Sequence, residues 1–184
     1  MNYFFLSRAE IEMVLERKRQ NYAVELMSGN EKRSSSPGKP PGGINKLNRL
    51  RHLDLSGTSI SSLSLSHGLQ CPDLRTLHLS DCRGGLVSEE GLTQAARSHP
   101  RLHQLSLSAS CLTDLGLIEL VSHLPRLDHL DIRRCKAITS GVLPPLTGLA
   151  PNLSTLLISG CSGIHPDAVK SLVPYFKYIK RIDL

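Results

Sequence analysis

Residues 127–132 read Leu-Asp-His-Leu-Asp-Ile, and this phrase, Leu-x-x-Leu-x-Leu with Ile allowed in place of Leu, recurs along the chain. Its copies begin, at steps of 24, 28, 25, 26 and 26 residues, at Leu50, Leu74, Leu102, Leu127, Leu153 and Ile179. A nearly fixed period of about 20 to 30 residues is typical of chains that stack one small structural unit on the next. The sequence therefore predicts an α/β fold, a leucine-rich repeat solenoid, in the form of a curved right-handed horseshoe segment with a parallel concave sheet and convex helices.

Each copy of the phrase predicts one short strand, and the residues after it predict a helix that returns over the convex side. Counting the first Leu of a copy as position i, strand alternation turns positions i+3 and i+5 toward the core. The predicted core pairs are Leu53 and Leu55, Leu77 and Leu79, Leu105 and Leu107, Leu130 and Ile132, and Leu156 and Ile158. Ser88, Thr113 and Thr139 are residue types that cap helix N-termini, so we expect helices to begin after them.

Composition agrees with a core of stacked leucines, since 33 of the 184 residues are Leu, none is Trp, and only 7 are Phe or Tyr. The formal net charge of +6 is carried mainly by residues 1–49, which hold 9 Lys and Arg against 5 Glu. Residues 50–184 hold 13 Lys and Arg against 11 Asp and Glu, so the repeats are nearly neutral. Because a duplex-binding domain carries a basic stripe on its folded surface, nucleic-acid binding is disfavoured.

Three regions are predicted along the chain. Residues 1–27 are an N-terminal amphipathic helix, since Ser7 and Glu10 fit a capping box and apolar residues follow at helical spacing. This helix either packs against the repeats as a cap or provides a basic surface for a membrane or a partner. Residues 28–45, rich in Ser, Gly and Pro, are a disordered linker. Residues 46–184 are the leucine-rich repeat domain, with five repeats and a partial sixth.

The five cysteines, Cys71, Cys82, Cys111, Cys135 and Cys161, are odd in number and include no Cys-x-x-Cys pair. Three of them occupy position i+8, where the other repeats have Thr58 and Ser110, so we expect a ladder of thiols and hydroxyls that donate to backbone carbonyls of the adjacent turn. Cys111 comes one place late, so either the third repeat shifts register or Ser110 takes the ladder position. Free structural thiols suit a reducing compartment, and the opening residues lack the basic region of a signal peptide. We expect a cytoplasmic location, with the nucleus as an alternative.

Positions i+2, i+4 and i+6 of the strands should face the concave side and form a broad polar surface. Candidate partner-binding residues on this face are His52, Asp54, His78, Gln104, His129, Asp131, Arg133, Arg134 and Arg181. The simpler interpretation of any one of them is a solvated polar position, since few surface residues contribute binding energy. Recognition of a protein substrate is the predicted role of the face as a whole.

The predicted open sheet disfavours both catalysis and metal binding. Asp54, His78 and Ser106 fall on three neighbouring strands and have the residue types of a hydrolytic triad. However, an open sheet supplies neither the sharp turn that exposes a nucleophilic Ser nor converging oxyanion donors. His52 and His129 lie three strands apart, which is too far to share a metal ion with bonds near 2 Å. We therefore predict that the chain is not an enzyme and needs no metal or cofactor.

The repeats resemble the cysteine-containing class of leucine-rich repeat, whose pattern continues from the strand phrase through Cys-x-x-Ile-Thr. Residues 127–142 match it at Leu127, Leu130, Ile132, Cys135, Ile138 and Thr139, and the resemblance covers residues 46–184. This class resembles the repeat region of F-box and leucine-rich repeat proteins. The resemblance implies protein binding, namely substrate recognition for an SCF-type (cullin-RING) ubiquitin ligase, in which an F-box contacts the ligase adaptor.

Residues 1–45 contain no Trp and no Leu-Pro, so this chain shows no recognisable F-box. The alternative prediction is therefore a leucine-rich repeat scaffold or assembly factor without a ligase role, including a mitochondrial one. The sixth copy reaches Leu184 at position i+5 with its strand barely complete. We expect a fragment, a shortened isoform, or a chain that completes its edge against a partner.

Overall fold

The computed structural model describes residues 50–62, 65–66, 69, 71–82 and 87–184. Its strands are β1 (His52–Asp54), β2 (Thr76–His78), β3 (Gln104–Ser106), β4 (His129–Asp131), β5 (Thr155–Leu157) and β6 (Arg181–Asp183). Its helices are α3 (Glu89–Ser98), α4 (Asp114–Ser122), α5 (Leu143–Leu149) and α6 (Pro166–Leu172), with 3-10 turns η3 (Ser140–Val142) and η4 (Val173–Tyr175). The predicted helix 1–27 and linker 28–45 lie outside the described residues.

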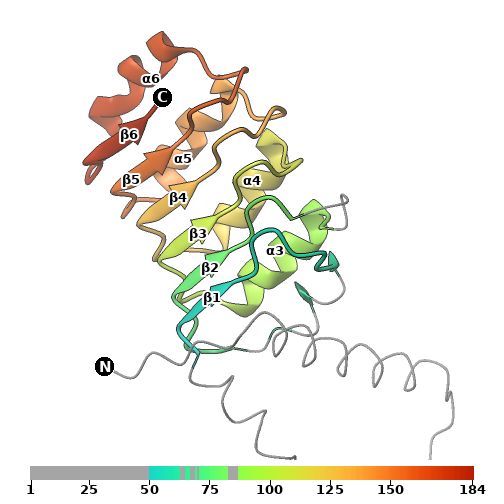
Figure 1. Cartoon of the computed structure of the whole chain (residues 1–184). Helices are drawn as coiled ribbons and strands as arrows, with labels where there is room; N and C mark the ends of the chain where they lie inside the picture. The colour runs from blue at the N-terminus through green and yellow to red at the C-terminus, as the bar shows by residue number, and fades with distance from the viewer. Residues whose placement is uncertain (1–49, 63–64, 67–68, 70, 83–86) are drawn as a thin grey trace, which may run out of the picture.

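The strands form one parallel sheet in the order in which they occur in the chain, as Figure 1 shows. Pairing is in register, because each repeat places the same position opposite its neighbour: Leu105 lies between Leu77 and Leu130. The carbonyl at i+1 of one repeat accepts two N–H bonds from the next, as Arg51 does from Arg75 at 2.8 Å and Thr76 at 2.9 Å. The predicted leucine-rich repeat solenoid is confirmed.

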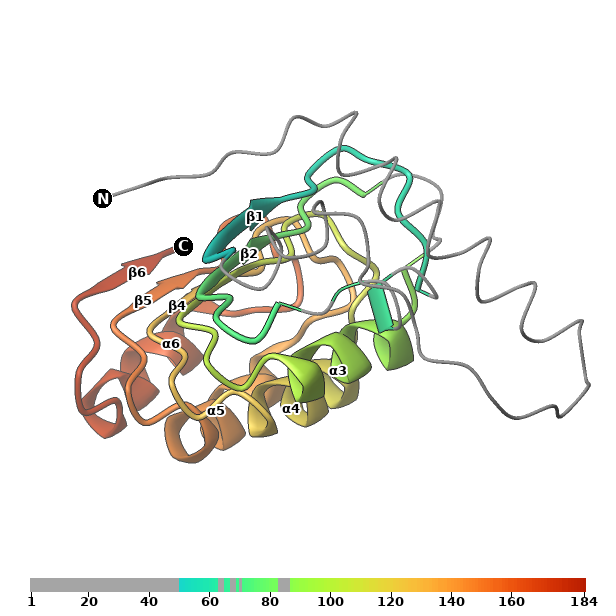
Figure 2. The same cartoon turned by 90° about the horizontal axis from the view of Figure 1, so that it is seen from below.

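The helices lie along the side of the sheet opposite the concave face, as seen in Figure 2. The leucines predicted to point inward are buried between these two layers: Leu130 and Leu156 are 0 % exposed and Leu53, at the first strand, is 4 % exposed. Burying each such side chain contributes about 1.5–3 kcal/mol, and no other layer of the described chain is needed to cover them. Among the described residues, no helix is long and apolar enough to cross a membrane.

Successive helices are joined at their N-termini by acidic side chains. Thr113 accepts a bond from the N–H of Gly116, which caps α4, and its own N–H donates to Glu89 at the start of α3. Asp114 does the same for the next repeat, accepting the N–H of Thr139 at 2.7 Å. Glu89 and Asp114, in the first turns of α3 and α4, therefore stabilise the capping residue of the next repeat as well as the positive N-terminal end of their own helix.

The predicted ladder at position i+8 is present. Cys161 donates its S–H to the carbonyl of Ile132 at 3.0 Å, and Cys135 to that of Leu107 at 3.3 Å, each in the preceding repeat. Ser110 holds the ladder position of the third repeat, since its N–H bonds Leu107 just as the N–H of Cys135 bonds Ile132. Cys111 is exposed, so the second of the two alternatives is the correct one.

Candidate functional site

The in-register sheet places equivalent positions of the six repeats in rows across the concave face. Of the candidate residues there, His52, Asp54, Gln104, Arg134 and Arg181 are exposed, His78, His129 and Arg133 are half-buried, and Asp131 is buried. Strand alternation alone does not predict these differences in burial. Burial is greatest at Asp131 because side chains of neighbouring strands form hydrogen bonds across the middle of the sheet and shield one another from solvent.

The row at position i+2 begins with a short chain of cross-strand hydrogen bonds. His52 Nδ1 lies 3.0 Å from Thr76 Oγ1, whose hydroxyl donates to Gln104 Oε1 at 3.4 Å. His129 follows in the same row on β4. Burial lowers the pKa of His129, and nearby carboxylates oppose this effect without reversing it. His129 is therefore mostly neutral at physiological pH and contributes hydrogen-bonding atoms more than charge.

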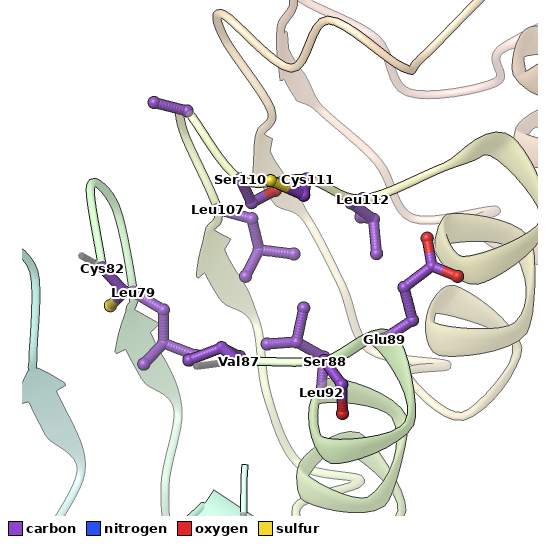
Figure 3. A pocket seen from close by; sticks show the side chains of 11 residues that line it. Leu79, Cys82, Val87, Ser88, Glu89, Leu92, Leu107, Ser110, Cys111 and Leu112 are labelled. Atoms are coloured by element: carbon purple, nitrogen blue, oxygen red, sulfur yellow. The ribbon is translucent and has the colours of Figure 1, made fainter. Parts of the chain in front are cut away.

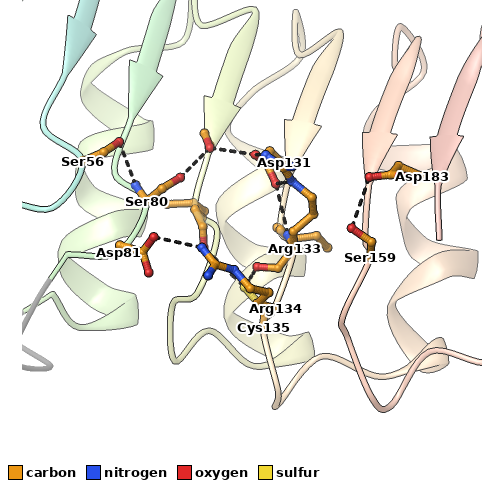
Figure 4. A network of polar contacts seen from close by, with 12 residues as sticks. Ser56, Ser80, Asp81, Asp131, Arg133, Arg134, Cys135, Ser159 and Asp183 are labelled. Atoms are coloured by element: carbon orange, nitrogen blue, oxygen red, sulfur yellow. Dashed lines mark hydrogen bonds and ion pairs between the residues drawn. The ribbon is translucent and has the colours of Figure 1, made fainter.

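A longer network runs across the centre of the face and is drawn in Figure 4. Ser56 Oγ accepts the N–H of Ser80 at 3.3 Å, and Ser80 Oγ lies 2.7 Å from Ser106 Oγ. Ser106 in turn donates to Asp131 Oδ2 at 3.1 Å. The serines at positions i+4 and i+6, which the sequence suggested only as polar neighbours, thus connect four repeats and end at one carboxylate.

Asp131 holds Arg133 in a fixed orientation. Arg133 Nε donates to Asp131 Oδ1 at 2.9 Å, Nη2 donates to Oδ2 at 2.7 Å, and the backbone N–H of Arg133 adds a third bond at 3.1 Å. Burial by itself would raise the pKa of Asp131, but these bonds and the Ser106 hydroxyl outweigh it and lower the pKa. Arg133 stays 43 % exposed, so its remaining N–H donors face solvent from a rigid position.

Arg134 lies at a turn position whose unusual backbone conformation the repeat pattern does not predict. Position i+7 takes a left-handed backbone in all five turns, with φ of 53° at Asp81, 58° at Ala109 and 59° at Arg134, and Gly57 and Gly160 at the two outer turns. Non-glycine residues rarely adopt this conformation. It aligns Arg134 with Asp81 two repeats away, and their side chains form an exposed ion pair at 2.9 Å.

The residues that resemble a hydrolytic triad have other partners. Ser106 is engaged by Ser80 and Asp131, and Asp54 accepts the backbone N–H of Ser56 at 2.9 Å. Such contacts leave the serine bonded to a carboxylate and not to an imidazole. Within the part of the chain that the structure describes, no group of three or more His, Cys, Asp or Glu side chains is arranged to hold a metal ion.

A cavity of about 300 Å³ lies between the second and third repeats, away from the concave rows (Figure 3). Its walls include Leu79 and Leu107 beside the strands and Leu92 of α3, with Cys111 and Glu89 among the other lining residues. The repeat pattern does not predict this cavity.

Comparisons with known proteins agree with the repeat class. No family model matches the chain. A protein of Arabidopsis thaliana described as F-box/LRR-repeat protein 21 is 31% identical to this chain over 113 residues. The match covers 52% of this chain and 37% of that protein. The protein described as F-box/LRR-repeat protein 23 of the same plant is 34% identical over 97 residues, covering 50% of this chain and 22% of that protein. The matches thus span between about a fifth and little more than a third of the length of these relatives.

Among solved structures, the TLR13–ssRNA13 complex superposes with a TM-score of 0.58 at 20% sequence identity, covering 77% of this chain and 20% of that chain. At this identity the likeness concerns the fold alone. Together with the strand register, the cysteine ladder and the plant relatives, it leads to one conclusion. The described residues form a leucine-rich repeat solenoid with thiol or hydroxyl side chains at position i+8, and they resemble the repeat region of F-box/LRR proteins.

Proposed function

We propose that the concave face binds a segment of a protein substrate and that the chain serves substrate recognition in an SCF-type (cullin-RING) ubiquitin ligase. The relatives described as F-box/LRR-repeat proteins support the ligase setting. The surface supports protein binding, because it is a broad row of mixed polar side chains on a rigid sheet. The compartment we propose is the cytoplasm, with the nucleus as the alternative.

The observation that carries the proposal is the fixed Arg133. Asp131, which also accepts the hydroxyl of Ser106, holds Arg133 at the centre of the face, so a partner that bonds the free N–H groups of Arg133 restricts little further side-chain motion on binding. Arginine is also enriched among the residues that dominate binding energy at protein interfaces. Asp183 on β6 adds a second negative charge near Arg133, so neutral carbonyl acceptors of a partner should be preferred there over carboxylates, which Asp183 and Asp131 would repel.

The matching experiment is affinity capture from cell extract with the tagged 184-residue chain, followed by quantitative mass spectrometry. The matched variants are Arg133→Ala and Arg126→Ala, since Arg126 is an exposed arginine between α4 and β4, off the concave face. A true concave-face partner should be retained about tenfold more weakly by Arg133→Ala and equally by Arg126→Ala. Equal retention by both variants would exclude Arg133 as the contact.

Because Arg133→Ala leaves Asp131 buried without its main partner, a fold control is needed. Arg133→Lys keeps the positive charge and loses the two-point contact, so it should keep most of the stability and still weaken the partner. Thermal melting of all variants separates loss of binding from loss of fold.

The second candidate is a scaffold or assembly factor without a ligase role, which would use the same concave face to hold a protein partner. The same capture decides between the two. Recovery of the cullin-ligase adaptor together with the Arg133-dependent partner supports the ligase proposal. Recovery of the partner without the adaptor, from an intact chain, supports the scaffold.

A further inference from the structure

The cavity between the second and third repeats, about 300 Å³ in volume, has the composition of a small-molecule site. Leu79 and Leu107, which follow β2 and β3, line it together with Leu92 of α3 and with Leu112. Figure 3 shows the side chains of Leu92, Leu107 and Leu112 pointing into the space between them. Pockets that bind small molecules have such apolar walls with a few polar groups among them. Because the cavity lies away from the concave rows, it can be occupied independently of the protein partner proposed above.

The volume of the cavity limits the size of its ligand. An apolar cavity of about 150 Å³ is large enough to hold benzene. The cavity here is about twice as large, which leaves room for a six-membered ring that carries a short chain. Its volume is also at the lower end of the range of about 300 to 1,000 Å³ that is usual for ligand pockets. We therefore expect a ligand of about ten non-hydrogen atoms.

The charge of the cavity wall comes from one side chain, Glu89 at the start of α3. It is the one carboxylate among the lining residues, and these residues include no Lys, Arg or His. Its Oε1 accepts the N–H of Thr113, which holds the carboxylate between the two repeats. Its Oε2 accepts no hydrogen bond from the residues that the structure describes. One acceptor oxygen with negative charge is therefore open to a ligand.

We propose that this cavity binds a small organic cation, whose apolar body lies among the leucines and whose protonated amine donates to Oε2 of Glu89. A hydrogen bond between two ionised groups is about twice as strong as one between neutral groups. The carboxylate repels an anion of the same shape, and a neutral molecule of that shape gains only the apolar contacts and an ordinary hydrogen bond. Charge thus selects the amine, and volume selects a single ring.

The exposed thiol of Cys111 provides the measurement, because Cys111 is one of the lining residues. The full 184-residue chain is alkylated with iodoacetamide, and the rate at Cys111 is followed by peptide mass spectrometry. The probes are 2-phenylethylamine, 2-phenylethanol and phenylacetate, which share one ring and differ in charge. The amine should slow alkylation with saturation at a Kd of about 1 mM. The alcohol should bind about fivefold more weakly, and phenylacetate more weakly still.

Two variants locate the site. Glu89→Gln keeps an oxygen that can accept the N–H of Thr113 and removes the charge, so the amine should then bind no more tightly than the alcohol. Val87→Phe enlarges a half-buried lining side chain and fills the cavity, so no probe should protect Cys111. Leu115→Phe is the matched control, since Leu115 is 79 % exposed on α4 and is not among the lining residues, and it should bind the amine as the wild type does.

Each alkylation rate is compared with the rate of the same variant without probe, and thermal melting shows that each variant is folded. Saturable protection by the amine that depends on both Glu89 and Val87 supports the proposal. The proposal is overturned if the amine gives no saturable protection of the wild type, or if phenylacetate protects as well as the amine does. It is also overturned if protection by the amine is unchanged in folded Glu89→Gln or in folded Val87→Phe.

Discussion

His99 is a histidine that the fold should keep neutral. Its side chain is 0 % exposed at the end of α3, where Nδ1 lies 2.6 Å from the carbonyl of Ala95 and Nε2 accepts the N–H of Cys71 at 3.3 Å. The ring thus joins the end of α3 to the last residues of the preceding repeat, just before β2. A proton on Nε2 would bring two N–H groups face to face in a buried place. Burial lowers the pKa of His99, and the bond to Ala95 only partly opposes this.

The direction of the resulting pH dependence follows by linkage. The unfolded histidine titrates near 6.5 and the folded one below that, so between the two values the unfolded chain binds more protons. The stability contributed by neutral His99 is therefore complete above about pH 6.5 and falls as the pH drops through the interval, by at most about 1.4 kcal/mol per unit for this one site. His129, whose pKa burial also lowers, adds a change of the same sign.

Urea unfolding at pH 7.5 and 5.5 measures this effect. His99→Gln should lower the free energy of unfolding at pH 7.5 by about 1–3 kcal/mol, because a buried N–H and carbonyl lose well-placed partners. It should also reduce the loss of stability between the two pH values. His165→Gln, at an exposed histidine before α6, should leave both quantities unchanged. If His99→Gln keeps the full wild-type pH dependence, the buried imidazole is not its source and the argument from Cys71 and Ala95 fails.

Three further predictions concern packing and caps. Leu130→Ala, at a side chain that is 0 % exposed, should cost about 2–5 kcal/mol in chemical denaturation, while Leu115→Ala at 79 % exposure should change stability by less than about 0.5 kcal/mol. Cys161→Ala removes the S–H bond to Ile132 and should cost about 1 kcal/mol, whereas Cys111→Ala at the exposed thiol should be nearly neutral in the same assay. Gly116→Ala places a Cβ against the carboxylate of Glu89 and should lower the melting temperature, and the loss should disappear in a Glu89→Ala background, where Ala favours the helix. If a variant and its matched control lose the same free energy of unfolding or the same melting temperature, the contact that differs between them does not contribute to stability as argued.

The strands and the core were predictable because the same repeated phrase, Leu-x-x-Leu-x-Leu, specifies both. In a parallel stack of equal units, Leu77, Leu105 and Leu130 take equivalent places as soon as the phrase is aligned, and hydrogen bonding in register fixes the rest. The position of Ser110 was predictable only as one of two alternatives. Choosing between them needed the backbone bond from Ser110 to Leu107, which depends on how the turn before Leu112 closes.

The sequence predicted which residues lie on the concave face, but not the hydrogen bonds and ion pairs that they form. The repeat pattern places Asp131, Arg133 and Arg134 near one another on this face. It does not predict that Arg133 turns back onto Asp131 while Arg134 turns away to Asp81. That difference comes from the left-handed backbone at position i+7, which non-glycine residues in three repeats adopt against their usual preference. The spacing of the leucines does not predict the φ angle at position i+7.

The proposed binding face depends on how fully the strands satisfy one another across the middle of the sheet. There Asp131 is buried, and its ion pair with Arg133 is held in place by several hydrogen bonds. A partner on the concave face must compete with bonds that are already made, so its affinity should depend on a few fixed donors such as Arg133 and little on the remaining polar side chains of the face.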